Sequence, residues 1–232
     1  MTDSPRDVKP NSDSENSSRG ATETKEDITS AVKLRRALLI EEQFINNQIR
    51  LAQTDSISLA IDLVDSVALL LIRGVPVRKC TLIRYSLNSS LQTLQKKEDV
   101  VSYFAEPFTT EQTWSTVPKV PYQIKKAPKD TIEAQRNASD LIVPETADVF
   151  FTLGCDRNLL ILFHQSKPYH LAGLLRKWWI QSRVRQYCTL YPLFHFQWPR
   201  RYQTIDLEMS QEDAKAILRA LPEQGYVILR LL

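Results

Sequence analysis

Cysteine and histidine, the side chains most often used for zinc binding and nucleophilic catalysis, gather in the C-terminal half of the chain. They are Cys155, His164, His170, Cys188 and His195. Their spacing does not fit a zinc site, because no two cysteines lie two to four residues apart and His164 and His170 are six apart across a proline. We therefore expect no bound metal.

Cys155 and His164 are the one candidate pair for a nucleophile and its base. They lie on either side of a Gly-Cys-Asp-Arg turn, and neighbouring strands about 5 Å apart would bring a thiol and an imidazole together. No third group is apparent that would orient the histidine. A phosphate-binding loop, a dinucleotide fingerprint and paired carboxylates are also missing from the sequence. We predict a protein that is not an enzyme and that has no cofactor.

A basic stretch is the strongest functional signal in the sequence. Between Arg157 and Ile205 there are eight lysines and arginines and no aspartate or glutamate, while the net charge of the whole chain is only +3. A solvated helix usually mixes both signs, because opposite charges four residues apart stabilise it. The excess predicts an acidic partner, either nucleic acid or an acidic protein surface, including this chain's own tail. The candidate binding residues are Arg176, Lys177, Arg183, Arg185, Arg200 and Arg201.

The same stretch is predicted to form a helix over about 169–187 with an apolar side. At about 100° per residue, five large side chains share a sector of roughly 140°, and the bases Arg176, Lys177 and Arg183 lie in a separate sector. We interpret the apolar sector as packing on a sheet, with the basic sector facing a partner. The five apolar residues are Leu171, Leu174, Leu175, Trp178 and Trp179.

The N-terminal half is predicted to be a tail followed by helices. Residues 1–30 carry seven acids and four bases among small polar residues, so we predict a disordered tail. Residues 31–106 are expected to be mainly helical. The spacing of apolar residues indicates a first helix. A second helix is predicted over 54–76, because apolar residues cover nearly its whole circumference and Gly74 can end it. The residues that carry the spacing of the first are Leu34, Leu38, Ile45 and Ile49.

The C-terminal half is predicted to be a separate domain after a linker. Residues 107–147 hold five of the twelve prolines and have no regular periodicity, which is typical of a linker or a wrapping segment. Residues 148–232 then alternate between strand and helix patterns, with strands at 190–198 and 201–209 joined by a turn at 198–201. From residue 158 the order is β-α-β-β-α-β, with one extra leading strand. This order predicts an α+β sandwich with a ferredoxin-like split β-α-β fold.

The sequence favours an interaction protein inside the cell. It lacks a signal peptide and a spanning apolar segment, so we expect an intracellular chain, nuclear or cytoplasmic, that is not secreted and does not bind a membrane. The strand at 158–164 is apolar on both faces, and one face must be covered by the first half of the chain or by a partner. We therefore predict a non-enzymatic subunit or adaptor of a multiprotein complex, with self-association as one way to cover that face. The alternative is a nucleic-acid-binding protein.

Overall fold

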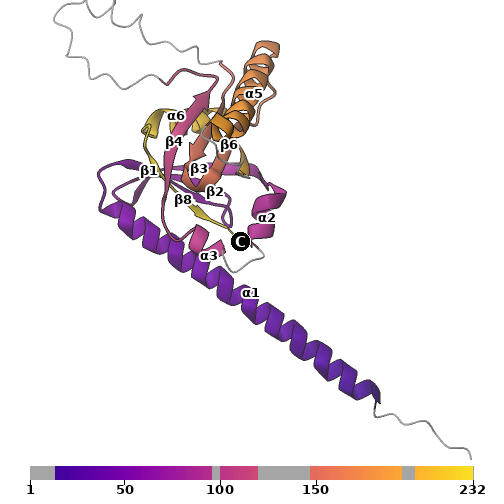
Figure 1. Cartoon of the computed structure of the whole chain (residues 1–232). Helices are drawn as coiled ribbons and strands as arrows, with labels where there is room; N and C mark the ends of the chain where they lie inside the picture. Colours follow the sequence, from indigo (N-terminus) through magenta and orange to yellow (C-terminus); the bar gives the residue numbers. More distant parts are fainter. Residues whose placement is uncertain (1–13, 96–99, 120–146, 195–201, 232) are drawn as a thin grey trace, which may run out of the picture. The chain divides into compact units, whose positions relative to one another are not determined.

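The structure is a computed structural model that describes residues 14–95, 100–119, 147–194 and 202–231 (Figure 1). The chain divides into two compact units, residues 1–39 and residues 40–232. The first helix, α1, runs over Ser14–Ala52. Its N-terminal part is therefore in the first unit, and its last turns are in the second unit with all of the strands.

Eight strands close into a barrel in the second unit (Figure 1). Their order around the barrel is β1-β2-β3-β7-β6-β5-β4-β8, and β8 closes on β1. Only the β1–β8 and β6–β7 pairs are parallel. The strands are β1 Ile57–Asp62, β2 Val67–Ile72, β3 Val75–Leu87, β4 Phe108–Ser115, β5 Phe150–Cys155, β6 Leu159–Gln165, β7 Gln203–Met209 and β8 Tyr226–Arg230. The other helices are α2 Ser89–Gln95, α3 Val100–Tyr103, α5 Leu171–Phe194 and α6 Gln211–Ala220, with a 3-10 turn at Asp156–Asn158.

The barrel interior is a packed hydrophobic core. Alternate strand residues point inward, as in β6, where Leu159, Ile161 and Phe163 are fully buried in one cluster. The ring of Phe163 stacks on that of Phe151 with 4.3 Å between the centroids. The helices α2, α3 and α6 add side chains to the same cluster, among them Leu91, Val100 and Ile217.

Two helices cover parts of the outside of the barrel. The last turns of α1 pack on β1, β2 and β8, and α5 packs on β5 and β6. The strand that is apolar on both faces, β6, thus has the barrel core on one side and α5 on the other. The buried α1 cluster contains Phe44, Leu51, Ala60, Leu71 and Ile228. The buried α5 cluster contains Phe150, Leu160, Ile180 and Val184.

The predicted helix over 54–76 is wrong, because this segment forms the β1–β2 hairpin and the turn into β3. Strands buried on both faces, here by the core and by α1, give a continuous apolar pattern that resembles a buried helix. Gly74 takes the predicted left-handed conformation, but it does so in a hairpin. Arg73 and Gly74 have φ of 50° and 76°, which is typical of a two-residue type I′ turn.

The predicted ferredoxin-like fold is also wrong. In a split β-α-β sheet a further strand separates the two parallel strands, whereas β6 and β7 are direct hydrogen-bonded neighbours. Helix α5 continues to Phe194, through most of the segment predicted to be the strand at 190–198. Strand β8 pairs with β1 and β4, so strands from both halves of the chain form a single barrel in place of a separate C-terminal α+β domain.

Several local predictions are confirmed within the barrel. The hairpin around the Gly-Cys-Asp-Arg turn is β5–β6, and β7 alternates with Ile205, Leu207 and Met209 buried. Helix α6 is capped by Ser210, whose Oγ accepts a hydrogen bond from the backbone N of Asp213 at 3.1 Å.

The tail predicted over residues 1–30 and the linker predicted over residues 107–147 are only partly described by the structure. Helix α1 begins at Ser14, within the predicted tail. Residues 1–13 and 120–146, which include most of the predicted linker, lie outside the described residues. Among the described helices, none is both long enough and apolar enough to cross a membrane.

Candidate functional site

Helix α5, which carries most of the candidate residues, rests on the barrel through a narrow stripe. Ile180 and Val184 are 4% and 7% exposed and pack on Phe150 and Leu160. One turn further along, the ring of Tyr187 lies 5.4 Å from that of Trp114 on β4. The buried residues of α5 in this contact are the β-branched Ile180 and Val184, and Tyr187 extends the contact to β4.

The first turn of α5 is held by the buried carboxylate of Asp148. Its two oxygens accept hydrogen bonds from the backbone N of His170 at 2.7 Å and from Nε2 of Gln165 at 2.9 Å. Gly173 is buried against the same carboxylate, and a methyl group at this position would overlap it. Burial by itself would raise the pKa of Asp148, but the bonds from Gln165 and His170 outweigh it and hold this pKa below its usual value.

We expect the attachment of α5 to the barrel to weaken at acidic pH. A carboxyl group with a lowered pKa in the folded state stabilises it above the unfolded pKa of about 3.9, and this stabilisation is lost as the pH falls through the folded-state pKa. At neutral pH, D148N should lower the free energy of unfolding by about 1.5–3 kcal/mol, because charge-assisted hydrogen bonds are lost. The difference between D148N and the wild type in the free energy of unfolding should stay constant above about pH 5 and should narrow as the pH falls below the unfolded pKa of about 3.9.

Urea denaturation at each pH measures this difference. Asp55 is an exposed carboxylate, and D55N serves as the matched control, for which we expect a difference of a few tenths of a kcal/mol at most at every pH. A gap between wild type and D148N that stays constant down to pH 3 would show that the charge of Asp148 does not hold the helix.

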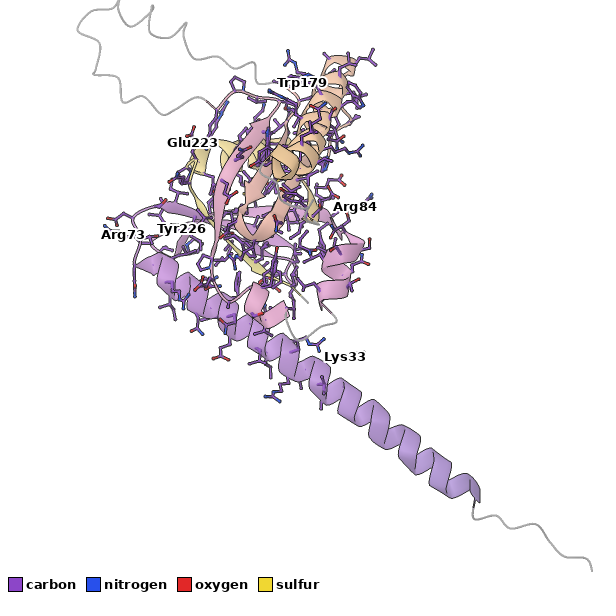
Figure 2. The ribbon with its side chains drawn as sticks, viewed as in Figure 1. Lys33, Arg73, Arg84, Trp179, Glu223 and Tyr226 are labelled. Atoms are coloured by element: carbon purple, nitrogen blue, oxygen red, sulfur yellow. The ribbon has the colours of Figure 1, made fainter. Side chains whose placement is uncertain are left out.

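The outward side of α5 carries the large apolar residues. We call Leu171, Leu174, Leu175, Trp178 and Trp179 the outer face. Leu171 is 83% exposed, Trp178 68% and Trp179 54%. Figure 2 labels Trp179 on this helix. The prediction that these residues pack on the sheet is wrong, since helical periodicity shows which residues share a side but not which side meets the barrel.

Three candidate bases lie beside the outer face. Arg176, Arg183 and Arg185 are exposed, and the guanidinium of Arg183 lies over the Trp179 ring, 4.6 Å from its centroid. Within the described part of the chain, no carboxylate forms an ion pair with any of the three. The arginines are therefore available to a partner, although binding stays a prediction.

The other candidate bases are placed differently. Lys177 is half-buried, with Nζ 4.6 Å from the ring centroid of Tyr169 and 5.6 Å from that of Phe150. Burial lowers the pKa of Lys177, although Asp206 opposes this shift. Its side chain therefore helps to fix α5 on the barrel. Arg200 and Arg201 lie outside the described residues.

The arginines of the described strands and their turns contrast with those of α5, because each of them pairs with a carboxylate of this chain. Arg78 lies 2.9 Å from Asp213, and Arg230 lies 3.0 Å from both Asp62 and Glu41. The full set is Arg73 with Asp55, Arg78 with Asp213, Arg84 with Glu208, Arg157 with Asp156, and Arg230 with Asp62 and Glu41. Unpaired guanidinium groups thus distinguish α5 from the strands and their turns.

Arg157, which belongs to the basic stretch, has a structural role. Its guanidinium donates hydrogen bonds to the carbonyl oxygens of Tyr103 at 2.8 Å and Pro107 at 2.9 Å. It also lies over the ring of Phe108, 3.8 Å from the centroid. No sequence signal indicates this role, because the partners are backbone carbonyls about fifty residues away.

The candidate nucleophile pair is not assembled. Cys155 pairs across the hairpin with Leu159, and His164 pairs with Phe150, so the thiol and the imidazole lie at opposite ends of the ladder. Cys155 is buried in the barrel core, and burial raises the pKa of its thiol. Among the described residues there is also no group of three cysteine, histidine or acidic side chains that would hold a metal ion. His195 lies outside those residues.

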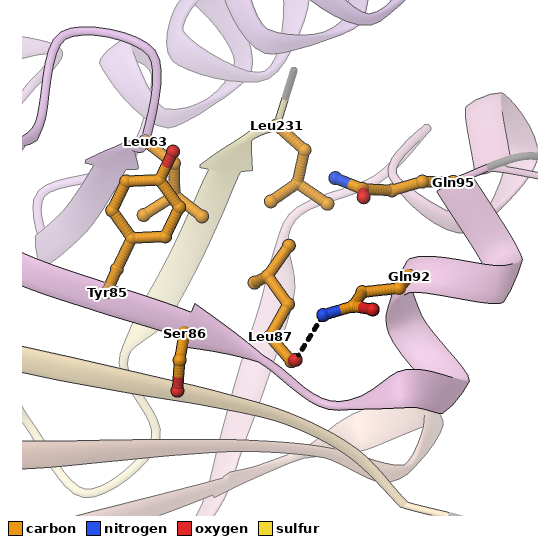
Figure 3. A pocket seen from close by; sticks show the side chains of 7 residues that line it. All are labelled: Leu63, Tyr85, Ser86, Leu87, Gln92, Gln95 and Leu231. Atoms are coloured by element: carbon orange, nitrogen blue, oxygen red, sulfur yellow. Dashed lines mark hydrogen bonds between the residues drawn. The ribbon is translucent and has the colours of Figure 1, made fainter.

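A cavity of about 420 Å³ lies beside the end of β3 and helix α2 (Figure 3). Its described lining is apolar or carries neutral polar groups, and Nε2 of Gln92 donates to the carbonyl oxygen of Leu87 at 2.9 Å. No aspartate, glutamate, histidine, lysine or cysteine is among the described lining residues, so this lining supplies no acid or base that titrates near neutral pH. The residues are Leu63, Tyr85, Ser86, Leu87, Gln92, Gln95 and Leu231.

The outer face of α5 with its three unpaired arginines is therefore the candidate site. Its chemistry is that of non-covalent binding, with tryptophan and leucine for apolar contact and guanidinium groups for acidic groups. Comparison with protein-family models, with curated proteins and with solved structures found no match for the chain.

Proposed function

We propose that this chain is a non-enzymatic subunit or adaptor that docks onto another protein through the outer face of α5. One observation carries the proposal: Trp178 and Trp179 are exposed although the barrel core is packed without them. Soluble proteins rarely leave such a contiguous apolar patch open, and large exposed patches usually mark interaction sites. Tryptophan and arginine are also the residues that most often dominate the energy of protein interfaces.

Quantitative co-purification from the cells that make this protein tests the proposal. We expect W178S/W179S to lose a stoichiometric partner that the wild type retains. Leu34 and Leu38 are 64% and 57% exposed, so L34S/L38S is a matched control for the loss of exposed apolar side chains. The same partners in equal amounts with wild type and W178S/W179S would contradict the proposal.

Nucleic-acid binding is the second candidate, favoured by the exposed and unpaired Arg176, Arg183 and Arg185 on a helix that contains no acidic residue. This function predicts a salt-sensitive affinity, with a log-log slope of roughly −0.7 to −0.9 per phosphate contact. The affinity for a DNA or RNA oligonucleotide should then disappear in R176E/R183E. Under the docking proposal, the wild type shows only weak, sequence-independent attraction at physiological salt. Under either function, we place the protein in the nucleus or cytoplasm.

A further inference from the structure

We propose that the occupant of the outer face is an acidic, leucine-rich helical segment of a partner protein. This inference rests on the docking function proposed above and adds the chemistry of the partner. It is carried by the arrangement of apolar and cationic side chains on one exposed side of α5.

The apolar side chains of α5 form a ridge of the kind used in helix recognition. Leu171, Leu175 and Trp178 follow the i, i+4, i+7 spacing and lie within about 60° of one another around the helix. They are 83%, 70% and 68% exposed, which makes this ridge the part of α5 that points most directly away from the barrel. Ridges with this spacing usually pack along the apolar side of another helix or into a helix-lined groove.

The arginines are placed at the border and at the end of this ridge. Arg176 and Arg183 are seven residues apart, which puts them on the same flank, about 10.5 Å apart along the axis. Arg185 is seven residues after Trp178 and so continues the line of the ridge. A partner helix that lies along the ridge would meet these cations with acidic residues spaced about two turns apart, and with leucine-type residues between them.

The arrangement favours a protein partner over nucleic acid. Affinity for nucleic acid depends mainly on cations that neutralise phosphates, whereas the outer face consists of five large apolar residues with three exposed arginines beside them. Lys177, which would add a fourth cation, is turned toward Tyr169 and Phe150.

Binding to an anionic membrane is an outcome of the test below, because the planar guanidinium of arginine forms two parallel hydrogen bonds with a phosphate as well as with a carboxylate. The three exposed cations of α5 are Arg176, Arg183 and Arg185. The guanidinium of Arg183 lies over the Trp179 ring, which places one of these groups directly at the outer face.

Titration of the full-length chain with two synthetic helical peptides of about 18 residues tests the inference. The first has a leucine face and glutamates seven residues apart on its flank, and the second is identical except that lysines replace the glutamates. Calorimetry and the emission of Trp178 and Trp179 report binding. We expect the glutamate peptide to bind roughly tenfold more tightly or better, a preference that disappears in high salt.

Charge reversal sharpens the test. R176E/R183E should reverse the preference, so that the lysine peptide binds more tightly than the glutamate peptide. K33E/R35E has the same change in net charge at exposed residues of α1 and should keep the wild-type preference. Circular dichroism should show the same fold for both variants, because all four side chains are exposed.

Several results would overturn the inference. Equal affinity of the wild type for both peptides would reject the acidic partner, as would a preference that R176E/R183E leaves unchanged. Tighter binding of phosphatidylserine vesicles or of a DNA or RNA oligonucleotide than of the glutamate peptide would assign the face to a membrane or to nucleic acid. If these results appear while a protein partner is still lost only with W178S/W179S, then the chemistry of the partner is wrong and the docking function stands.

Discussion

Replacing both Trp178 and Trp179 with serine is expected to lower the free energy of unfolding by no more than about 1.5 kcal/mol. The reason is that 68% and 54% of these side chains are exposed, so far less buried area is lost than at two core tryptophans. Removal of a tryptophan from a protein core typically costs about 3–5 kcal/mol. Urea denaturation of the double variant therefore distinguishes an α5 whose tryptophans face solvent from one whose tryptophans face the barrel, because the expected losses of stability differ by several kcal/mol.

The same experiment on Trp114 is the matched control. Its ring packs against Gly154 and Tyr187, and W114S should be clearly destabilised in the same assay. If W178S/W179S lost as much stability as W114S, the tryptophans of α5 would be core residues in the native state. That outcome would remove the observation on which the docking function rests.

The second large effect is expected on the opposite side of the same helix. Ile180 is 4% exposed and packs in the cluster between α5 and the barrel. I180A should lower the free energy of unfolding by about 2–4 kcal/mol, because it removes buried methyl groups and leaves a cavity. The helix should also become more sensitive to proteolysis, since α5 would open more often than the barrel.

Leu175 provides the comparison for this variant. It is also aliphatic and also on α5 but is 70% exposed, so L175A should change stability by no more than about 0.5 kcal/mol. Similar losses in I180A and L175A would show that α5 is buried on both sides. A loss of stability in L175A but not in I180A would show that the helix is rotated about its axis relative to this structure.

Local sequence signals predicted those elements whose pattern depends on neighbours in the chain. The β5–β6 hairpin follows from its turn, β7 follows from the alternation of Ile205, Leu207 and Met209, and α6 follows from its Ser210 cap. The β1–β2 hairpin was missed because Leu59 points into the core while Ala60 lies under α1, which removes the alternation of apolar and polar residues. Closure of the barrel depends on pairing between distant strands, such as β1 with β8, which local periodicity does not encode.

The candidate site was predicted in composition but not in orientation. The sequence placed Arg176, Lys177 and Arg183 together on one side of a helix; the two arginines are exposed there, whereas Lys177 is half-buried. The predicted direction of the Trp178 side chain was wrong, because the helix packs on β5 and β6 through a second, smaller apolar stripe that consists of Ile180 and Val184. The β-branched side chains of this stripe fill the contact with the strands, and the carboxylate of Asp148 fixes the first turn. Neither feature stands out in a helical wheel.

The central claim is that one side of α5 holds the helix on the barrel and leaves the outer face for a partner. Hydroxyl-radical footprinting tests it most directly, by comparing the purified chain with the same chain in the cells that produce it. We predict that Trp178 and Trp179 are oxidised rapidly in the purified chain and are protected several-fold in cells, relative to the exposed Leu34. Slow oxidation of both tryptophans in the purified chain, or equal rates in the two settings, would contradict the claim.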